Sequence, residues 1–205
     1  MPVTEQQQAI LERFAAEVAA SPHNLVSRRA REELWTRHVP EAVAVADLLP
    51  SAASRLLDIG SGGGLPGFVI AVVRPDLEVH LLDSTAKKTR FLHHVAERLQ
   101  VTVSVHTGRA EELARGPLAA AFEVVTARAV APLDRLAGLA APFLAPGGVL
   151  YAIKGARWHA ELEAAERAIA RAGLAVAATP DDLPPSVGGD EAVTPRVVML
   201  SRGSH

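Results

Sequence analysis

Apolar residues between positions 51 and 201 recur at two spacings that alternate along the chain. Short apolar runs predict strands at 55–59, 78–82, 101–105, 122–127, 149–154, 174–178 and 196–200. Apolar positions three or four residues apart predict helices between them, at 66–73, 85–99, 109–114, 131–143 and 158–171. Strands that alternate with helices in this way predict an α/β fold, in which a parallel sheet is covered on both faces.

The connection before the last expected strand differs from the others. Residues 180–195 are rich in proline, aspartate and glycine and show no helical period. A strand that is reached without a crossover helix can pair antiparallel with its predecessor. We therefore expect a seven-stranded, mostly parallel sheet whose last strand is antiparallel.

The first fifty residues carry helical patterns only. Residues 4–20 place Ile10, Leu11, Phe14 and Val18 on one helical face. Residues 21–24 break this helix, and a second helical region is expected at 28–49, broken or kinked near Pro40. We expect residues 1–50 to be an N-terminal helical cap packed on a core domain at 51–201. Residues 202–205 (RGSH) look like the remnant of an added tag.

Composition narrows the class of protein. The 205 residues are 49% hydrophobic and 21% charged, with a net charge of −2, and they contain no cysteine. Disulfides, a cysteine nucleophile and a thiolate zinc site are therefore excluded, and the composition fits a reducing cytosol. No signal peptide is evident at the N-terminus. Proline and glycine interrupt the uncharged stretch at 136–153, so no membrane span is expected. We expect a cytoplasmic monomer.

A glycine-rich loop is the strongest chemical signal. The apolar residues Leu56 and Leu57 lead into Asp58, and five glycines follow at positions 60, 62, 63, 64 and 67. A strand, a glycine loop and a helix in this order are typical of a nucleotide-type cofactor site. The loop satisfies the G-x-G-x-x-G pattern only loosely, so several cofactors remain open at this point.

Two carboxylates bear on which cofactor binds. Asp58 would repel a pyrophosphate, but it could order the loop or receive an ammonium group such as that of S-adenosylmethionine. Asp83 ends the next strand, nineteen residues after Gly64, where an acidic residue accepts hydrogen bonds from ribose hydroxyls. Asp83 could instead cap the following helix. Likewise, Glu111 could be only a carboxylate stabilised by the dipole of a helix N-terminus.

These motifs, taken in order, resemble the Rossmann-like methyltransferases that use S-adenosylmethionine. More specifically, the motifs resemble one family, the bacterial 16S ribosomal RNA guanine-N7 methyltransferases, also called glucose-inhibited division protein B. The segments that carry the resemblance are 57–67 (LDIGSGGGLPG), 81–84 (LLDS), 87–88 (KK), 91–92 (FL), 108–113 (GRAEEL), 126–131 (TARAVA), 154–155 (KG), 24–25 (NL) and 37–38 (RH). The resemblance covers about residues 20–200.

The chain departs from the pattern of this family at three places. Thr126-Ala127 replaces Ser before Arg128, Val26 replaces Thr, and residues 38–42 (HVPEA) stand where His-Phe-x-Asp-Ser is common. The third change concerns the N-terminal cap and leaves the expected cofactor site untouched.

The resemblance implies a Rossmann-like methyltransferase fold and S-adenosyl-L-methionine as the cofactor. It implies that Gly60 and Leu65 contact the methionine and ribose parts, that Ala110 and Glu111 hold the adenine, and that Arg128 lies by the methionine and the substrate. Together with the motif residues around them, the expected cofactor-binding set is Asp58, Gly60, Gly62, Gly64, Leu65, Asp83, Ser84, Ala110, Glu111 and Arg128.

The implied substrate is 16S ribosomal RNA or the 30S subunit. Arg128 and Lys154 end successive expected strands, at the edge where open α/β sheets bind ligands. Arg128 could bind the cofactor carboxylate, hydrogen-bond guanine O6 or anchor a phosphate. The other candidates for RNA contact are Arg28, Arg29, Lys87 and Lys88, with Arg31 and Arg157 weaker.

The expected reaction needs no general base. Guanine N7 has a free lone pair at neutral pH, so catalysis should come mainly from alignment of the reacting atoms, with Arg128 in a positioning role. No metal site is expected, since the adjacent His93 and His94 point different ways on a helix and His80 belongs to a strand. Three alternatives stay open: methylation of a small molecule or protein, a non-catalytic cofactor-binding scaffold, and a disfavoured nicotinamide dehydrogenase.

Overall fold

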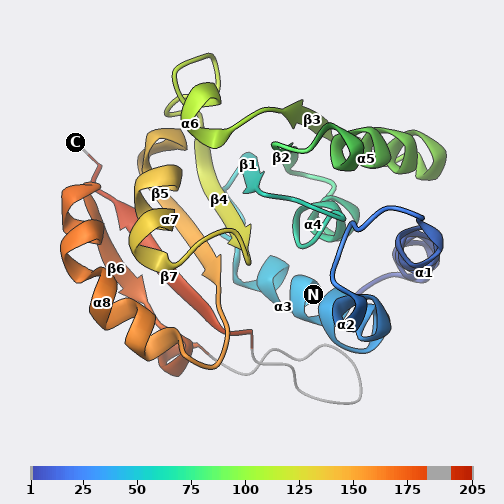
Figure 1. Cartoon of the computed structure of the whole chain (residues 1–205), viewed down its shortest axis with the longest axis horizontal. Coiled ribbons are helices and arrows are strands. Elements are labelled where there is room, and N and C mark those ends of the chain that lie inside the picture. The colour runs from blue at the N-terminus through green and yellow to red at the C-terminus, as the bar shows by residue number, and fades with distance from the viewer. Residues whose placement is uncertain (1, 184–194, 205) are drawn as a thin grey trace.

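A seven-stranded sheet organises the chain in the order β3-β2-β1-β4-β5-β7-β6 (Figure 1). This is a computed structural model, and it describes residues 2–183 and 195–204. The strands are β1 (Arg55–Ile59), β2 (Glu78–Asp83), β3 (Ser104–Thr107), β4 (Phe122–Arg128), β5 (Leu144–Ile153), β6 (Leu174–Ala178) and β7 (Val197–Arg202). The pairs from β3 to β5 are parallel, and β7 lies antiparallel between β5 and β6. The expected fold class is confirmed.

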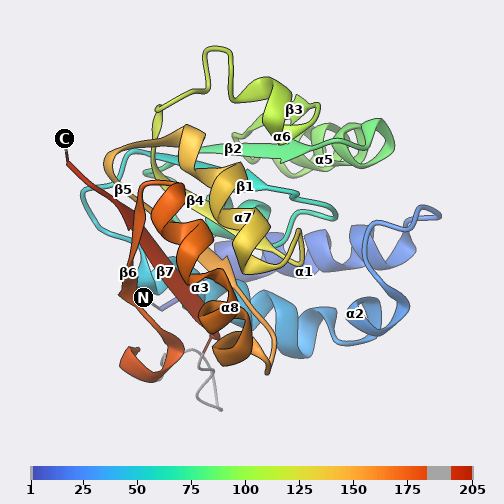
Figure 2. The same ribbon diagram turned by 60° about the vertical axis from the view of Figure 1, so that its left-hand side comes forward.

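Helices cover both faces of the sheet. They are α1 (Glu5–Ala20), α2 (Arg28–Glu32), the π-helical turn η1 (Leu34–His38), α3 (Val39–Leu48), α4 (Gly67–Val73), α5 (Ala86–Leu99), α6 (Ala110–Leu113), α7 (Leu133–Ala140), α8 (Trp158–Arg171) and the 3₁₀ turns η2 (Ala141–Phe143) and η3 (Pro180–Asp182). One apolar core lies under α1, α3, α4 and α5, and a second lies under α7 and α8 (Figures 1 and 2). In Figure 2, α7 and α8 lie in front of the sheet.

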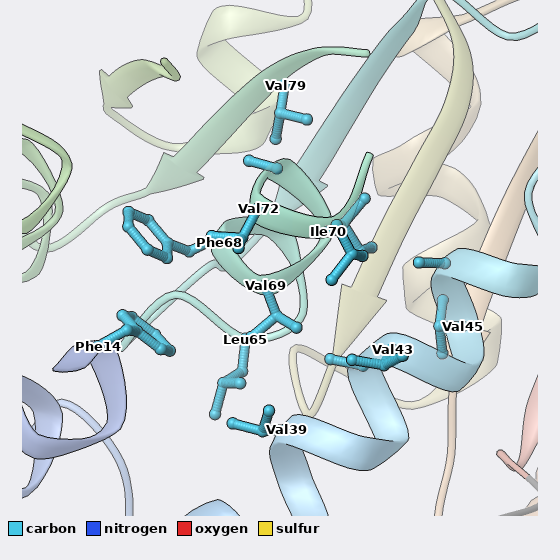
Figure 3. Packing of buried hydrophobic residues seen from close by; sticks show 14 of the residues in the cluster. Phe14, Val39, Val43, Val45, Leu65, Phe68, Val69, Ile70, Val72 and Val79 are labelled. Atoms are coloured by element: carbon cyan, nitrogen blue, oxygen red, sulfur yellow. The ribbon is translucent and has the colours of Figure 1, made fainter. Parts of the chain in front are cut away.

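The N-terminal helices share the first of these cores. The ring of Phe14 stacks on that of Phe68, with 4.5 Å between the centroids (Figure 3). Gln7 Nε2 donates to the carbonyl oxygen of Val72 at 3.0 Å and so satisfies a group at the end of α4 that has no partner within the helix. Leu65 lies against Val39 of α3, with its side chain in the core. Residues 2–50 are thus packed directly on the element that follows the glycine loop.

Two strands begin at other residues than the sequence predicts. β3 begins at Ser104 rather than at 101, and β5 begins at Leu144 rather than at 149. The β4–β5 register passes from Phe122↔Leu144 to Val124↔Val149, so three extra residues of β5 form a bulge. Gly147 has a φ of +77° there, a conformation that suits glycine. The glycines before residue 149 therefore lie in a bulge inside the strand rather than ahead of it.

Two other expectations need correction at their edges. The helical region at 28–49 is divided by η1, and Pro40 lies in the first turn of α3, where its missing N–H costs no hydrogen bond. Arg202 belongs to β7, and its Nη1 donates to the carbonyl oxygens of Ala141 and Leu144. The core domain therefore extends past residue 201. Of the helices in the described ranges, none has the length and apolar character needed to span a bilayer.

Gly67 is expected to be one of the least replaceable residues of the fold. A Cβ at this position would lie 2.5 Å from Leu81 Cδ2 and 2.6 Å from Asp58 Cβ. Gly67→Ala should therefore lower the free energy of unfolding by about 2–3 kcal/mol through overpacking, as measured by urea denaturation. The control is Gly138→Ala on α7, where a Cβ meets nothing within 4 Å and the change should be neutral or stabilise by up to about 1 kcal/mol. Equal effects of the two changes would contradict this account.

Candidate active site

The strand register brings the expected site residues to one edge of the sheet. Ile59 of β1 lies beside Leu82 of β2 and Ala127 of β4, so the glycine loop leaves the sheet between Asp83 and Arg128. The carboxyl ends of the five parallel strands β3, β2, β1, β4 and β5 therefore meet at this edge. Open α/β sheets bind their ligands here, where the strand order reverses around β1 and β4.

Hydrogen bonds fix the glycine loop to the end of β2. The amides of Gly60 and Ser61 donate to the carbonyl oxygen of Leu82 at 2.7 and 3.0 Å, and Ser61 Oγ accepts from Leu82 N at 3.1 Å. Gly62 N donates to Asp83 Oδ2 at 3.0 Å. The loop therefore has a defined shape before any ligand binds. Ser61 supports this shape, and no pattern in the sequence singles it out.

Asp58, near the end of β1, holds the glycine loop in shape through a hydrogen bond. Its Oδ2 accepts from Gly67 N at 3.2 Å and its Oδ1 accepts from Thr126 Oγ1 at 2.8 Å, while its side chain is fully buried. Burial raises the pKa of Asp58 to about 6, although the hydrogen bonds from Thr126 and Gly67 oppose the shift. Of the two roles open to Asp58, the contacts in this structure fit loop ordering.

The raised pKa of Asp58 predicts a pH dependence of stability. Between about pH 4 and pH 6 the folded state keeps a proton that the unfolded state has lost, so stability falls as pH rises through this window. Asp58→Asn does not titrate. The unfolding free energy of the unsubstituted protein, minus that of Asp58→Asn, should therefore fall by about 2 kcal/mol between pH 4 and pH 7. Urea denaturation at several pH values measures it, and a pH-independent difference would contradict the assignment.

Asp83 combines two structural contacts with spare acceptor capacity. Oδ2 accepts from Gly62 N, Oδ1 accepts from Thr85 N at 2.8 Å, and Lys88 Nζ lies 3.7 Å from Oδ2. The contact with Thr85 is at the start of α5, so part of the helix-capping role is present. A carboxylate offers about four acceptor positions. Positions thus remain for the hydroxyls of a ribose.

The expected adenine side lies at the ends of β2 and β3. Ser84 is exposed just after Asp83, and Ala110 begins α6 with little exposure. Glu111 is half exposed, and its Oε1 lies 3.5 Å from Arg135 Nη2. Leu65 differs from its neighbours, because its side chain is buried in the core. A contact of Leu65 with a cofactor would have to come from its backbone.

A cavity of about 760 Å³ opens at the ends of β4 and β5. Its lining includes five basic residues, Arg29, Arg37, Arg128, Lys154 and Arg196, against three acidic residues, Glu33, Glu41 and Glu161. Val130, also in the lining, touches the glycine loop, since a Cβ on Gly60 would lie 2.6 Å from Val130 Cγ2. The cavity is therefore adjacent to the expected cofactor loop and carries an excess of positive charge.

Arg128 is held inside this cavity by the N-terminal cap. Its Nη1 lies 2.7 Å from His38 Nδ1 and 3.8 Å from Glu41 Oε2, and only 18% of its side chain is exposed. Arginine can only donate, so His38 Nδ1 is the acceptor in this contact. Burial lowers the pKa of Arg128, and Glu41 and Asp58 oppose this shift. Arg128 thus lines the cavity beside the glycine loop, and its role toward cofactor and substrate stays a prediction.

Lys154 is less free than the sequence suggested. Its Nζ lies 2.6 Å from Glu161 Oε2 and donates to the carbonyl oxygen of Ala131 at 3.1 Å, with 7% of the side chain exposed. Lys154 therefore ties the loop after β4 to α8. A contact with RNA would require it to exchange Glu161 for a phosphate.

The remaining expected RNA contacts lie at the protein surface. Arg29, 79% exposed, pairs with Glu33 at the rim of the cavity, and Arg28 is exposed beside it. Lys88 is turned toward Asp83. Lys87 lines a separate hollow of about 360 Å³, between α1 and α5, together with Arg90, His94 and His23. The structure does not bring Lys87 and Lys88 to the cavity of Arg128.

Known structures share the fold of this chain. The ribosomal protein L11 methylase from Lactobacillus delbrueckii subsp. bulgaricus superposes with a TM-score of 0.57 at 14% identity, covering 80% of this chain and 77% of that one. The fibrillarin pre-rRNA processing protein of Methanococcus jannaschii gives 0.53 at 13% identity, covering 74% and 67%. At these identities the likeness establishes a methyltransferase-like fold alone.

Sequence comparison is more specific. Ribosomal RNA small subunit methyltransferase G of Sorangium cellulosum (strain So ce56) is 46% identical over 151 residues, which cover 72% of this chain and 63% of the relative. The protein of the same name from Thermobifida fusca (strain YX) is 43% identical over 172 residues, covering 83% and 69%. Residues 7–182 match the family described as rRNA small subunit methyltransferase G. The chain therefore belongs to the rRNA small subunit methyltransferase G family.

Proposed function

We propose that this chain transfers a methyl group from S-adenosylmethionine to N7 of a guanine in 16S ribosomal RNA of the small ribosomal subunit. Family membership supports ribosomal RNA of the small subunit as the substrate class. The structural observation that supports the proposal most is the placement of Arg128, which lines a basic cavity directly beside the glycine loop.

The residues at the sheet edge fit S-adenosylmethionine. Asp83 keeps acceptor positions for ribose hydroxyls after its contacts with Gly62 and Thr85. The start of α6 at Ala110 and Glu111 lies at the next strand end, where the adenine would be held. When bound, the cofactor would supply a methyl group on a sulfonium sulfur, an electrophile that the lone pair of guanine N7 could accept.

The residues of this chain act by binding and orientation. Asp58 and Ser61 keep the loop in shape, so the cofactor meets a preformed site. Arg128 is held by His38 and Glu41 at the border of the loop and the cavity, where it can bind a substrate oxygen and fix the base. N7 carries its lone pair at neutral pH, and alignment of the attacking and leaving atoms is the main contribution that such a site makes.

The basic lining supports a nucleic-acid substrate. The five cations around the cavity exceed its three carboxylates, although the whole chain has a net charge of −2. Concentrated positive charge next to a catalytic site binds phosphates and steers RNA toward it. We infer that the 30S subunit or its 16S RNA is the partner and that the chain acts as a monomer in the cytoplasm.

Transfer of a tritiated methyl group tests this function. The protein is incubated with labelled S-adenosylmethionine and with unmodified 30S subunits, free 16S RNA, or 23S RNA as a control. The proposal predicts label in 16S RNA or 30S subunits and none in 23S RNA. Label in none of them would favour a small molecule or a protein as the acceptor. A thermal-shift comparison of S-adenosylmethionine with NAD separates the methyltransferase from a dehydrogenase.

A further inference from the structure

Glu41 is an unusual carboxylate within the cavity. Only 16% of its side chain is exposed, and it comes from α3 of the N-terminal cap rather than from the sheet. Its Oε2 lies 3.4 Å from His38 Nδ1 and 3.8 Å from Arg128 Nη1. Burial works against the charge, but the positive charge of Arg128 favours the ionised form, and the pKa of Glu41 lies below its ordinary value. An ionised acceptor therefore faces the substrate space.

The other two carboxylates of the cavity already have close partners. Glu33 binds two arginines of the cap at 2.7 and 2.9 Å, and Glu161 binds a lysine at 2.6 Å. The contacts of Glu41 are longer, at 3.4 Å and 3.8 Å. His38 Nδ1 accepts from Arg128, so this atom has no proton to donate to Glu41. Within the described part of the chain, Oε1 of Glu41 has no hydrogen-bond partner. A ligand that donates a hydrogen bond to this oxygen would therefore stabilise the partly buried carboxylate.

The pair formed by Glu41 and Arg128 has the donor–acceptor pattern that complements guanine. The guanine edge presents the acceptor O6 next to the donors N1–H and N2–H₂. A guanidinium and a carboxylate 3.8 Å apart present a donor next to an acceptor. Adenine presents the reverse order, a donor followed by the lone pair of N1, which would face the carboxylate. Proteins that do chemistry on a base extracted from its stack read it at this edge.

We infer that Glu41 is a specificity-determining residue that accepts hydrogen bonds from N1–H and the 2-amino group of the target guanine. The inference rests on the proposed function. In this orientation N7, on the other ring of the purine, stays free to attack the methyl group. The bond from N1–H also strengthens during the reaction, because the purine becomes positively charged as N7 forms its new bond. Glu41 therefore stabilises the transition state more than the bound substrate.

The test pairs a change in the enzyme with a change in the base. 16S RNA is prepared with hypoxanthine, which lacks only the 2-amino group, at the guanine that the unsubstituted protein methylates. The ratio of kcat/KM for guanine over hypoxanthine is measured. We expect a ratio of roughly 10 to 100 for the unsubstituted protein, the loss of one charge-assisted hydrogen bond. In Glu41→Ala the ratio should fall to within about twofold of unity, because the acceptor is gone from both reactions.

Two further variants keep the test decisive. Glu41→Gln keeps the size of the side chain and should also lose most of the discrimination, and unchanged S-adenosylmethionine affinity shows that it is folded. Glu33→Ala removes another carboxylate from the same cavity and should leave the ratio unchanged. The inference would be overturned if both Glu41 variants kept the guanine-over-hypoxanthine ratio, that is, if kcat/KM fell equally for the two bases. Glu41 would then only support Arg128. If the unsubstituted protein does not methylate guanine at all, the proposed function fails instead.

Discussion

Replacement of Arg128 by alanine is expected to lower the rate of methyl transfer roughly 100- to 1,000-fold, because a buried, pre-positioned cation at the reacting centre is lost. Arg128 is held by His38 and Glu41 at the border between the glycine loop and the cavity. Its role is to fix the base, so kcat/KM for RNA should fall far more than the affinity for S-adenosylmethionine. Arg128→Lys should recover only part of the activity, since an ammonium is a compact charge and lacks the planar fork of donors with which a guanidinium reaches two partners.

A buried arginine away from the site provides the control. The side chain of Arg74 is 7% exposed and pairs with Asp76 at 2.7 Å, near the start of β2 and the opposite edge of the sheet. Arg74→Ala should lower the unfolding temperature and leave kcat/KM of the folded protein nearly unchanged. Near-normal activity of purified Arg128→Ala would remove Arg128 from the mechanism. A similar loss in Arg74→Ala would mean that the effect reports on stability.

The second large effect is expected at Asp83. Asp83→Ala should raise the Kd of S-adenosylmethionine roughly 10- to 100-fold in calorimetry, because it removes a charged acceptor for the ribose hydroxyls. The same carboxylate binds the amides of Gly62 and Thr85, so the glycine loop should also loosen. Asp83→Asn keeps an acceptor oxygen but loses the charge, and we expect an intermediate Kd.

Asp76 serves as the matched control for Asp83, because it is an aspartate that precedes the same strand at the other edge of the sheet. Its side chain is 52% exposed, and Asp76→Ala should leave the Kd within about twofold, since removal of a distant surface charge has little effect on binding. An unchanged Kd in Asp83→Ala would take Asp83 out of the cofactor site and leave it as an anchor for the loop and α5.

The sequence predicts the centre of the sheet well, because β1, β2 and β4 are largely buried on both faces and read as apolar runs, whereas the edge strands β3 and β6 are less buried. It also identifies the edge that carries the site, since Asp58, Asp83 and Arg128 each lie at or beside a strand end. The bulge in β5 was missed, because a proline and two glycines in series are typical of a turn as much as of a bulge.

The part of the site that comes from the cap could not be predicted. His38 and Arg128 are ninety residues apart and meet only because α3 packs on α4. Their sequences carry no spacing that would reveal the pair. The motif at 37–38 did point to a role for this segment. Lys154 shows the converse limit, because its pairing with Glu161 depends on where α8 begins.

The most direct test of the account is the identity of the methylated nucleoside. Small-subunit RNA methylated by the purified protein is digested to nucleosides and analysed by mass spectrometry against standards for each methylguanosine. We expect 7-methylguanosine at a single position, and almost none with Arg128→Ala. A methyl group on another atom of the base, on a ribose, or on a protein of the particle would contradict this expectation.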